Sequence, residues 1–428
     1  MTAAIVMTSF FALLLLGVPL VFSLGASAFV GVFILAPNGA SIAALQIFES
    51  LNSFPLVAIP MFLLMANLMS VGGVTNALVG FANSLVGHIR GSLAIGNVAA
   101  STLFSGISGS CLADTTAVGS MMIPAMVKEG YPPAFAGAVT AAANIVGPII
   151  PPSILMILYG FSAEVSVIDL FMAGIIPGLF LSLVFGVYAW WVSSRNGYGS
   201  IEHKFRFRNV GRAMFAALPA LVIPGVIVAG VLGGVFTISE SAGIAALYAL
   251  GYAMVRGKLR GQVPWKEIRL SFYNTAIDTG VVMFLLGTSG LLTWVLTRSQ
   301  TPQEIVALMD GFSPAVTLMM INVFLLVLGL FLEPAPALLL CTSLLLPLAR
   351  AMGVDPVHFG IIMIVNLQLG VLSPPVASAA IVTSRIAGIT MDQQIRALWP
   401  FLGLGTLALL VITYVPGFSL WIPHMLAK

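Results

Sequence analysis

The sequence predicts an all-α polytopic membrane protein built from an inverted structural repeat, with about ten transmembrane spans and two re-entrant helical hairpins. Composition is the first observation behind this fold class. Of the 428 residues, 7% are charged and 59% are hydrophobic, whereas a soluble chain has roughly a quarter charged residues. Residues 1–48 contain no Asp, Glu, Lys or Arg, and later uncharged runs also approach the ~20 residues that a membrane helix needs. An internal repeat and the placement of basic residues are the other two observations.

Composition also excludes several classes of protein. The apolar content excludes a water-soluble enzyme, a disordered chain and a secreted disulfide scaffold. Both cysteines, Cys111 and Cys341, lie in apolar runs and indicate neither a disulfide nor a zinc site. A net charge of +3 is too small and too localised to indicate nucleic-acid binding. The opening segment lacks a basic region and continues into apolar sequence, so we expect a retained span instead of a cleaved signal peptide.

The internal repeat has a fixed offset of 223 residues and consists mainly of glycines and prolines, which fix backbone geometry. The first copy contributes Gly106, Pro124, Gly130, Pro133, Gly137, Gly147, Pro151, Pro152, Asp169 and Pro177. The second copy matches them with Gly329, Pro347, Gly353, Pro356, Gly360, Gly370, Pro374, Pro375, Asp392 and Pro400. The two copies are therefore expected to share their turns and kinks.

Each copy is expected to hold three spans, a helical hairpin and two further spans, the first of these broken. The first copy, 1–194, has spans near 3–22, 24–37 and 51–72, an amphipathic stretch at 74–88, a hairpin at 91–127, a broken span at 131–160 and a span at 168–194. The second copy, 213–428, has spans near 214–233, 236–255 and 271–297, an amphipathic stretch at 301–311, a hairpin at 312–350, a broken span at 356–384 and a span at 393–424. A hairpin makes no net crossing, so each copy crosses five times and the second copy is inverted.

Basic residues agree with this inversion. They fill the linker 195–212 between the copies and the loop that follows one helical pair later: Arg195, Lys204, Arg206, Arg208 and Arg212, then Arg256, Lys258, Arg260, Lys266 and Arg269. The positive-inside rule places both segments in the cytoplasm. Both termini are then outside, the first hairpin opens from the cytoplasm and the second from the outside. We interpret these basic loops as topology signals, in preference to lipid-specific or nucleic-acid binding.

Polar hairpin tips and broken helices are the strongest functional pattern. The first hairpin turns at Phe104–Ser110, and the broken span contains Asn144–Ser153, where prolines 148, 151 and 152 remove amide donors and leave carbonyls without partners. The second copy has Phe331–Pro336 at its tip and Asn366–Pro375 at its break. Such backbone is tolerated at membrane depth only where it is buried in protein or faces a cavity. Carbonyl and hydroxyl oxygens are ligands that hard monovalent cations prefer, so the duplication predicts two related cation sites.

Four carboxylates lie at membrane depth: Asp114, Glu240, Asp278 and Glu333. Intramembrane carboxylates are costly and indicate function, but each could instead bond neighbouring helices or cap one. ATP coupling has no support, because Gly251–Lys258 has the wrong glycine spacing for a phosphate-binding loop and is followed by Leu259. No organic cofactor is expected.

At these motifs the sequence resembles the large membrane subunit of the tripartite ATP-independent periplasmic (TRAP) transporters, over essentially the whole chain. The motifs are Phe104–Ser110, Ala113–Pro124, Gly130–Tyr131, Gly147–Ser153 with Tyr159–Gly160, and Gly234–Ser241 with Tyr248–Ala249. One departure is Ile238–Ser239, where the family commonly has Pro-Thr.

The resemblance implies sodium symport of an organic acid, such as a C4-dicarboxylate, a sialic acid or another sugar acid, across the bacterial inner membrane. It also implies two protein partners: a periplasmic substrate-binding protein and a small four-helix membrane subunit, here expected as a separate chain. An elevator mechanism would move a transport domain, 91–194 with 312–428, against a scaffold, 1–90 with 213–300. Membrane lipid is the remaining partner.

The coupling ions, about two or more sodium ions, are expected at sites formed by a tip and a break. Site 1 would use Ser105, Ser108, Gly147, Ile150 and Pro152. Site 2 would use Glu333, Pro334, Gly370 and Ser373. Substrate would lie between the tips, where helix N-termini offer amides to a carboxylate, with Ser110, Asn144, Ser153 and Asn366 as the expected binding residues.

Three alternatives remain open at this point: a self-sufficient sodium-coupled carboxylate symporter, an integral membrane enzyme and a passive channel. No nucleophile pair or His/carboxylate cluster is evident at depth, which disfavours the enzyme. The inverted hairpins suit alternating access, which disfavours the channel.

Overall fold

The computed structural model describes residues 2–36, 38–199, 207–309, 311–374 and 377–426, and in these ranges all regular structure is helical. The first copy contains α1 (Thr2–Leu15), α2 (Leu20–Leu35), α3 (Gly39–Leu51), η1 (Phe54–Val57), α4 (Ala58–Val71), α5 (Val74–Val86), α6 (Ser92–Ser108), α7 (Cys111–Lys128), α8 (Pro133–Asn144), η2 (Gly147–Ile149), α9 (Ile154–Ala163) and α10 (Val167–Asn196). The second contains α11 (Phe207–Leu232), α12 (Ile238–Leu259), α13 (Trp265–Arg298), α14 (Thr301–Met309), α15 (Pro314–Gly329), α16 (Pro334–Ala351), α17 (Pro356–Gly370), α18 (Ser378–Ala387), α19 (Met391–Tyr414) and α20 (Gly417–Leu426).

The sequence repeat is also a structural repeat. Helix α7 and helix α16 begin and end at positions separated by the 223-residue offset, and α8 and α17 both begin at the matched prolines Pro133 and Pro356. Proline is favoured at this first helical position because its missing amide would have no partner there. The matched residues therefore act locally, by fixing where helices start.

The predicted all-helical polytopic fold is confirmed, although a strict length criterion finds fewer than ten spans. Among the described residues, seven helices are long and apolar enough to cross a membrane, and the bent pair α8–α9 makes an eighth. One of the seven is the hairpin helix α16, while α1, α2 and the pair α17–α18 fall short of the criterion. Ten crossings are reached only if α1, α2 and the pair α17–α18 also cross the membrane. Of these, α1 has 14 residues and is about 21 Å long.

The N-terminal region differs from the expected boundaries in two places. The chain turns at Gly17, with φ of 79°, and Pro19, so α2 begins earlier than expected. The helix α3 over Gly39–Leu51 was not predicted. By the repeat, α3 and α4 together correspond to the single long helix α13, and Pro55 accounts for the interruption because it cannot donate an amide to a continuous helix.

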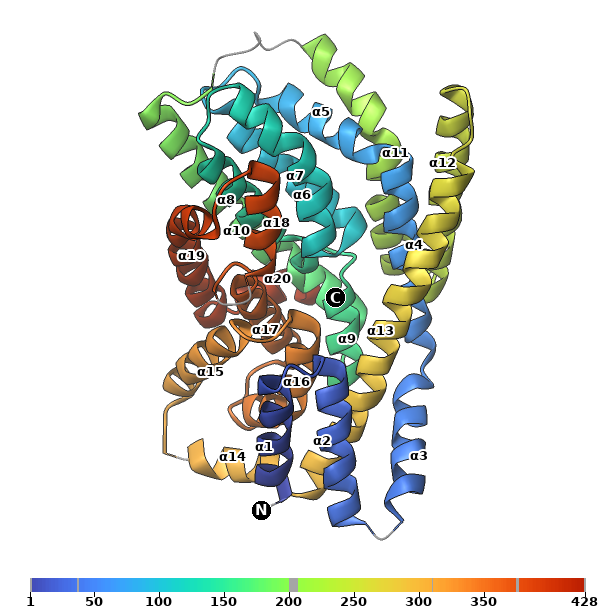
Figure 1. The fold of residues 1–428 in the computed structure, drawn as a ribbon, viewed down its shortest axis with the longest axis vertical. Helices are drawn as coiled ribbons and strands as arrows, with labels where there is room; N and C mark the ends of the chain where they lie inside the picture. Colours follow the sequence, from blue (N-terminus) through green and yellow to red (C-terminus); the bar gives the residue numbers. More distant parts are fainter. Residues whose placement is uncertain (1, 37, 200–206, 310, 375–376, 427–428) are drawn as a thin grey trace.

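The two copies run in opposite directions along the molecule (Figure 1). The transverse helix α5 lies near one end, and its counterpart α14 lies at the other end, beside the N-terminus. Arg260, in the basic loop between α12 and α13, lies against Gly73 at the start of α5, where an added Cβ would be 2.9 Å from its guanidinium. This places the basic loop at the α5 end. Lys204 and Arg206 of the basic linker lie outside the described residues.

The broken helices pack across the repeat. The second half of the first broken helix, α9, packs against hairpin helix α16 of the other copy, and α18 packs in the same way against α7. A separate wall of helices, in which α4 packs on α12 and α2 on α13, stands beside this bundle (Figure 1). Many large apolar side chains on the wall are exposed, including Phe215, Tyr273 and Phe284. Such an apolar surface suits lipid in place of water.

Candidate functional site: two hairpin tips and a cavity between them

The tip of the first hairpin is a two-residue turn in close contact with the broken helix. Helix α6 ends at Ser108, Gly109 adopts a left-handed φ of 61°, and Ser110 is extended before α7 begins. A Cβ at Gly109 would lie 2.6 Å from the carbonyl oxygen of Pro152. Glycine is required here both for its φ and for this close approach.

The break itself consists of a short 3-10 turn, η2, and a bent segment, residues 150–153, outside regular structure. Ile150 is extended, with φ −95° and ψ 134°, and helix α9 restarts only after Ser153. The carbonyl oxygens of Pro151 and Pro152 lie near the tip, since Cβ atoms added at Gly106 and Gly109 would be 3.6 Å and 2.6 Å from them. The structure thus brings carbonyls of the break to the predicted hairpin.

Three of the residues predicted for site 1 meet around one carboxylate. Ser108 Oγ donates a hydrogen bond to Asp114, and a Cβ added at Gly147 would overlap the second oxygen of that carboxylate. The same Cβ would lie 3.7 Å from Ser105 Oγ, whose proton goes to the Ser101 carbonyl at 2.7 Å. Ser105 and Asp114 are fully buried, and Ser108 nearly so. Sequence analysis noted Asp114 but did not assign it to this site.

The second tip meets its break through the backbone of two glycines. A Cβ at Gly370 would lie 2.6 Å from the carbonyl carbon and oxygen of Gly329, which ends α15. Ser373 donates its amide to the Gly370 carbonyl at 2.9 Å and its hydroxyl to the Leu369 carbonyl at 3.2 Å. Glu333 is the N-cap of α16, and its side chain is exposed. Gly329 belongs to the repeat but was not proposed as a site residue.

A cavity of about 170 Å³ lies between the two tips. Four helices contribute the residues at their N-termini to its wall: Cys111 and Leu112 of α7, Ile154 and Leu155 of α9, Pro334 and Ala335 of α16, and Ser378 of α18. The first amides of a helix have no partner within it, and the helix dipole favours negative charge at this end. The cavity is therefore suited to an anion.

Polar side chains at this cavity include Ser110, Glu333 and Gln368. Gln368 is 2% exposed and its Oε1 has no hydrogen-bond partner among the described residues, so it can accept from a ligand. Sequence analysis did not select Gln368. Its position inside the Asn366–Pro375 segment was the available signal.

Three of the predicted substrate residues lie elsewhere. Ser153 is buried, donates to the Pro148 carbonyl at 2.5 Å and caps α9 by accepting from the Met156 amide. Asn144 donates to Thr140 of its own helix, and Asn366 donates to Asn322 Oδ1 at 2.8 Å. None of the three is among the residues that line the cavity.

The two remaining intramembrane carboxylates lie outside these sites. Glu240 is exposed and accepts from both the amide and the hydroxyl of Thr237, at 2.8 and 2.9 Å, which completes a capping box at the start of α12. Asp278 is exposed on α13. The capping role that the sequence allowed is therefore present at Glu240.

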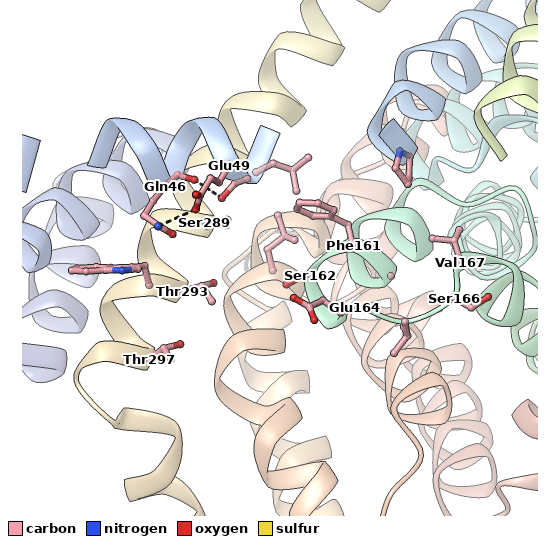
Figure 2. A pocket seen from close by; sticks show the side chains of 18 of the residues that line it. Gln46, Glu49, Phe161, Ser162, Glu164, Ser166, Val167, Ser289, Thr293 and Thr297 are labelled. Atoms are coloured by element: carbon pink, nitrogen blue, oxygen red, sulfur yellow. Dashed lines mark hydrogen bonds between the residues drawn. The ribbon is translucent and has the colours of Figure 1, made fainter. Parts of the chain in front are cut away.

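A larger cleft of about 860 Å³ separates the helix wall from the bundle (Figure 2). One side carries Glu49 on α3 together with Ser289 and Thr293 on α13, and the other carries Ser162 and Glu164 at the end of α9. These residues are far apart in the sequence, and the sequence analysis proposed no cleft there.

An inverted repeat of hairpins and broken helices, with a cavity between the tips of a multi-pass membrane protein, is the arrangement that secondary transporters use. Comparison with known proteins identifies the particular family. Residues 7–418 match the model of the tripartite ATP-independent periplasmic transporter, DctM component, and the chain belongs to this family. It is accordingly a multi-pass protein of the bacterial inner membrane.

Individual relatives support this assignment over nearly the full chain. The C4-dicarboxylate TRAP transporter large permease protein DctM of Pseudomonas aeruginosa is 36% identical, with 94% of each chain covered. The sialic acid TRAP transporter large permease protein SiaM of Vibrio cholerae is 37% identical, with 96% of each covered. The isethionate TRAP transporter permease protein DctMQ of Oleidesulfovibrio alaskensis is 34% identical over 97% of this chain and 66% of that protein.

The fold also occurs at much lower sequence identity. The crystal structure of the YdaH transporter of Alcanivorax borkumensis superposes with a TM-score of 0.65, covering 96% of this chain and 98% of that one at 15% identity. This likeness concerns the fold alone.

Proposed function

We propose that the chain is the membrane permease of a sodium-coupled importer of a small organic anion, working with a periplasmic binding protein and a small four-helix membrane subunit. The observation that carries the anion assignment is the convergence of four helix N-termini on one cavity. The relatives named above are described as permeases for C4-dicarboxylate, sialic acid and isethionate, which are all anions.

The size of the cavity favours the smaller of these anions. About 170 Å³ is well below the ~300 Å³ at which pockets for drug-sized ligands begin. A short dicarboxylate or sulfonate suits this space better than a nine-carbon sugar acid. Gln368 and Ser110 would bond the oxygens that the helix termini do not reach.

Sodium is proposed at the two places where a tip meets a break. Around Gly147 the ligands would be Ser105, Ser108 and the carbonyls of Ile150 and Pro152, and around Gly370 they would be backbone oxygens with Ser373 and the Glu333–Pro334 tip. Among the described residues, no three His, Cys, Asp or Glu side chains gather as a metal site. Hydroxyl and carbonyl oxygens would therefore provide most ligands.

Sodium coupling would supply enough energy for concentrative uptake. Two sodium ions entering with one monovalent anion move one net charge, which provides ~2.3 kcal/mol at 100 mV. Two tenfold sodium gradients add ~2.8 kcal/mol, and the total corresponds to accumulation on the order of thousands-fold.

The cleft of Figure 2 supports an elevator movement. It lies between α3 and α13 on the wall and the α9–α10 turn on the bundle, which is the boundary between the proposed scaffold and transport domain. The cleft leaves open space along this part of the boundary, whereas α13 packs on α16 and α4 on α6 elsewhere, so a sliding movement would have to exchange those contacts.

Uptake in proteoliposomes tests this proposal. The chain is reconstituted with its small subunit, loaded binding protein is added outside, and each component and sodium is omitted in turn. We expect uptake only when all are present. Robust uptake by this chain alone would instead identify a self-sufficient symporter, and uptake unaffected by sodium would reject the coupling ion.

A further inference from the structure

Asp114 is a buried carboxylate whose charge is not balanced by a basic side chain. It lies in the first turn of α7 and is fully buried. One oxygen accepts from Ser108, while Oδ2 has no hydrogen-bond partner among the described residues. No Lys or Arg in the described part of the chain forms an ion pair with it. Burying a carboxylate without a counter-charge is costly, so a partner is expected when it is ionised.

The unpartnered oxygen lies at the broken helix. A Cβ added at Gly147 would overlap Oδ2, and the Ser105 hydroxyl is on the same side of that glycine. Oδ2 thus occupies the space that the missing side chain of Gly147 leaves open. Ser105 Oγ and Asp114 Oδ2 therefore lie on the same side of Gly147, and Ser108 Oγ is bonded to the other oxygen of the same carboxylate.

The second copy is different at the same place. The 223-residue offset relates Asp114 to Ala337, which is fully buried, and Gly147 to Gly370. At Gly370 the neighbour is the Gly329 backbone instead of a carboxylate. Glu333 does not replace the missing charge in an equivalent position, because its repeat partner is Ser110 and its side chain is exposed at the anion cavity.

We propose that Asp114 is a direct ligand of the cation in site 1, so that the position which Asp114 and Ala337 share in the repeat carries a charge in the first site alone. The inference rests on the sodium coupling proposed above. One carboxylate with neutral oxygens matches a monovalent cation, since sites for divalent cations use more carboxylates. A filled site 1 carries no net charge, so it fills whether or not an anion occupies the cavity. The equivalent position of site 2 depends on backbone dipoles.

Sodium-dependent thermal unfolding of the purified full chain tests this without substrate or partners. Melting temperature is measured against sodium at constant ionic strength, with choline as the replacement cation. Asp114→Asn keeps the size and removes the charge, and we expect the half-saturating sodium concentration to rise at least about tenfold. Asp278→Asn is the matched control, because it makes the same change at an exposed position on α13, and its value should equal that of the unchanged protein.

A second measurement uses the unchanged protein, in case Asp114→Asn does not fold. Dicyclohexylcarbodiimide, an apolar reagent, adds to buried carboxyl groups and leaves a stable mass increase on the peptide. We expect sodium, but not choline, to slow the labelling of Asp114, because a bound cation occupies the reactive oxygens.

The outcomes separate this inference from the proposed function. If sodium does not stabilise the unchanged protein, both are overturned. If sodium stabilises both the unchanged protein and Asp114→Asn, and the half-saturating sodium concentration is the same for the two, the proposed function stands and Asp114 is not a ligand. Asp114 labelling that is indifferent to sodium, in a protein that sodium stabilises, also overturns the inference alone.

Discussion

Gly370→Ala is expected to disable the second site by separating the hairpin tip from the broken helix. The added Cβ would lie 2.6 Å from the carbonyl carbon and oxygen of Gly329, whereas ordinary van der Waals contact begins at 3.4 Å. The neighbour is backbone, so no side-chain rotation can relieve the overlap. The two segments must therefore move apart by about 1 Å in a close-packed region.

The expected cost follows from this displacement. Overpacking by one carbon in a packed interior costs ~1–3 kcal/mol. Because ~1.4 kcal/mol is a factor of ten in an equilibrium, the sodium concentration for half-maximal uptake should rise by roughly one to two orders of magnitude. The assay is sodium-dependent uptake in the reconstituted three-component system, with melting temperature measured in parallel to confirm that the protein is folded.

Two further glycine variants provide the comparison. Gly403→Ala, on α19, adds the same atom where nothing lies within 4 Å, so it should be neutral or slightly stabilising. Gly147→Ala meets a side-chain oxygen of Asp114 that can rotate, so its effect should lie between the two. If Gly370→Ala behaves like Gly403→Ala in both measurements, the Gly329–Gly370 contact does not hold the site and the reasoning is refuted.

Three other predictions use the same materials. Cysteines placed at the exposed positions Asn196 and Ser313 should react with an impermeant thiol reagent from opposite sides of the membrane, because both native cysteines are buried, and equal labelling in whole cells would contradict the inverted topology. Ser108→Ala and Ser373→Ala should each weaken sodium affinity without abolishing uptake, since backbone carbonyls remain, and two unchanged half-saturation values would remove the hydroxyls from the ligand set. Gly147→Val should be more damaging than either serine change, and a silent result would reduce the break to a packing kink.

The sequence alone determined the class, the repeat and the positions of the hairpins and broken helices. These features depend on local chemistry: apolar runs long enough for a membrane, and prolines and glycines that end helices wherever the chain is placed. Helix α16 and helix α7 start at repeat-related residues for this reason. The helix α3 was missed because neither a charge pattern nor a repeat residue marks it.

Only the tertiary structure decided which polar side chains reach the cavity. Asn144, Ser153 and Asn366 lie on the predicted segments, yet Asn144 bonds its own helix, Ser153 caps α9 and Asn366 bonds α15, while Gln368 lines the cavity. Local sequence cannot set this choice, because the direction in which a broken helix faces depends on the elements packed around it.

The tertiary structure also decided how the two copies share one cavity. Its wall combines the N-termini of α7 and α9 from the first copy with those of α16 and α18 from the second, and each broken helix packs on the hairpin of the other copy. The repeat predicted two related cation sites, and the structure brings Asp114 to Gly147 in the first copy, whereas the Gly329 backbone lies at Gly370 in the second. Sequence fixes what each copy can form by itself; the convergence of separate helix termini depends on long-range packing, which no local pattern contains.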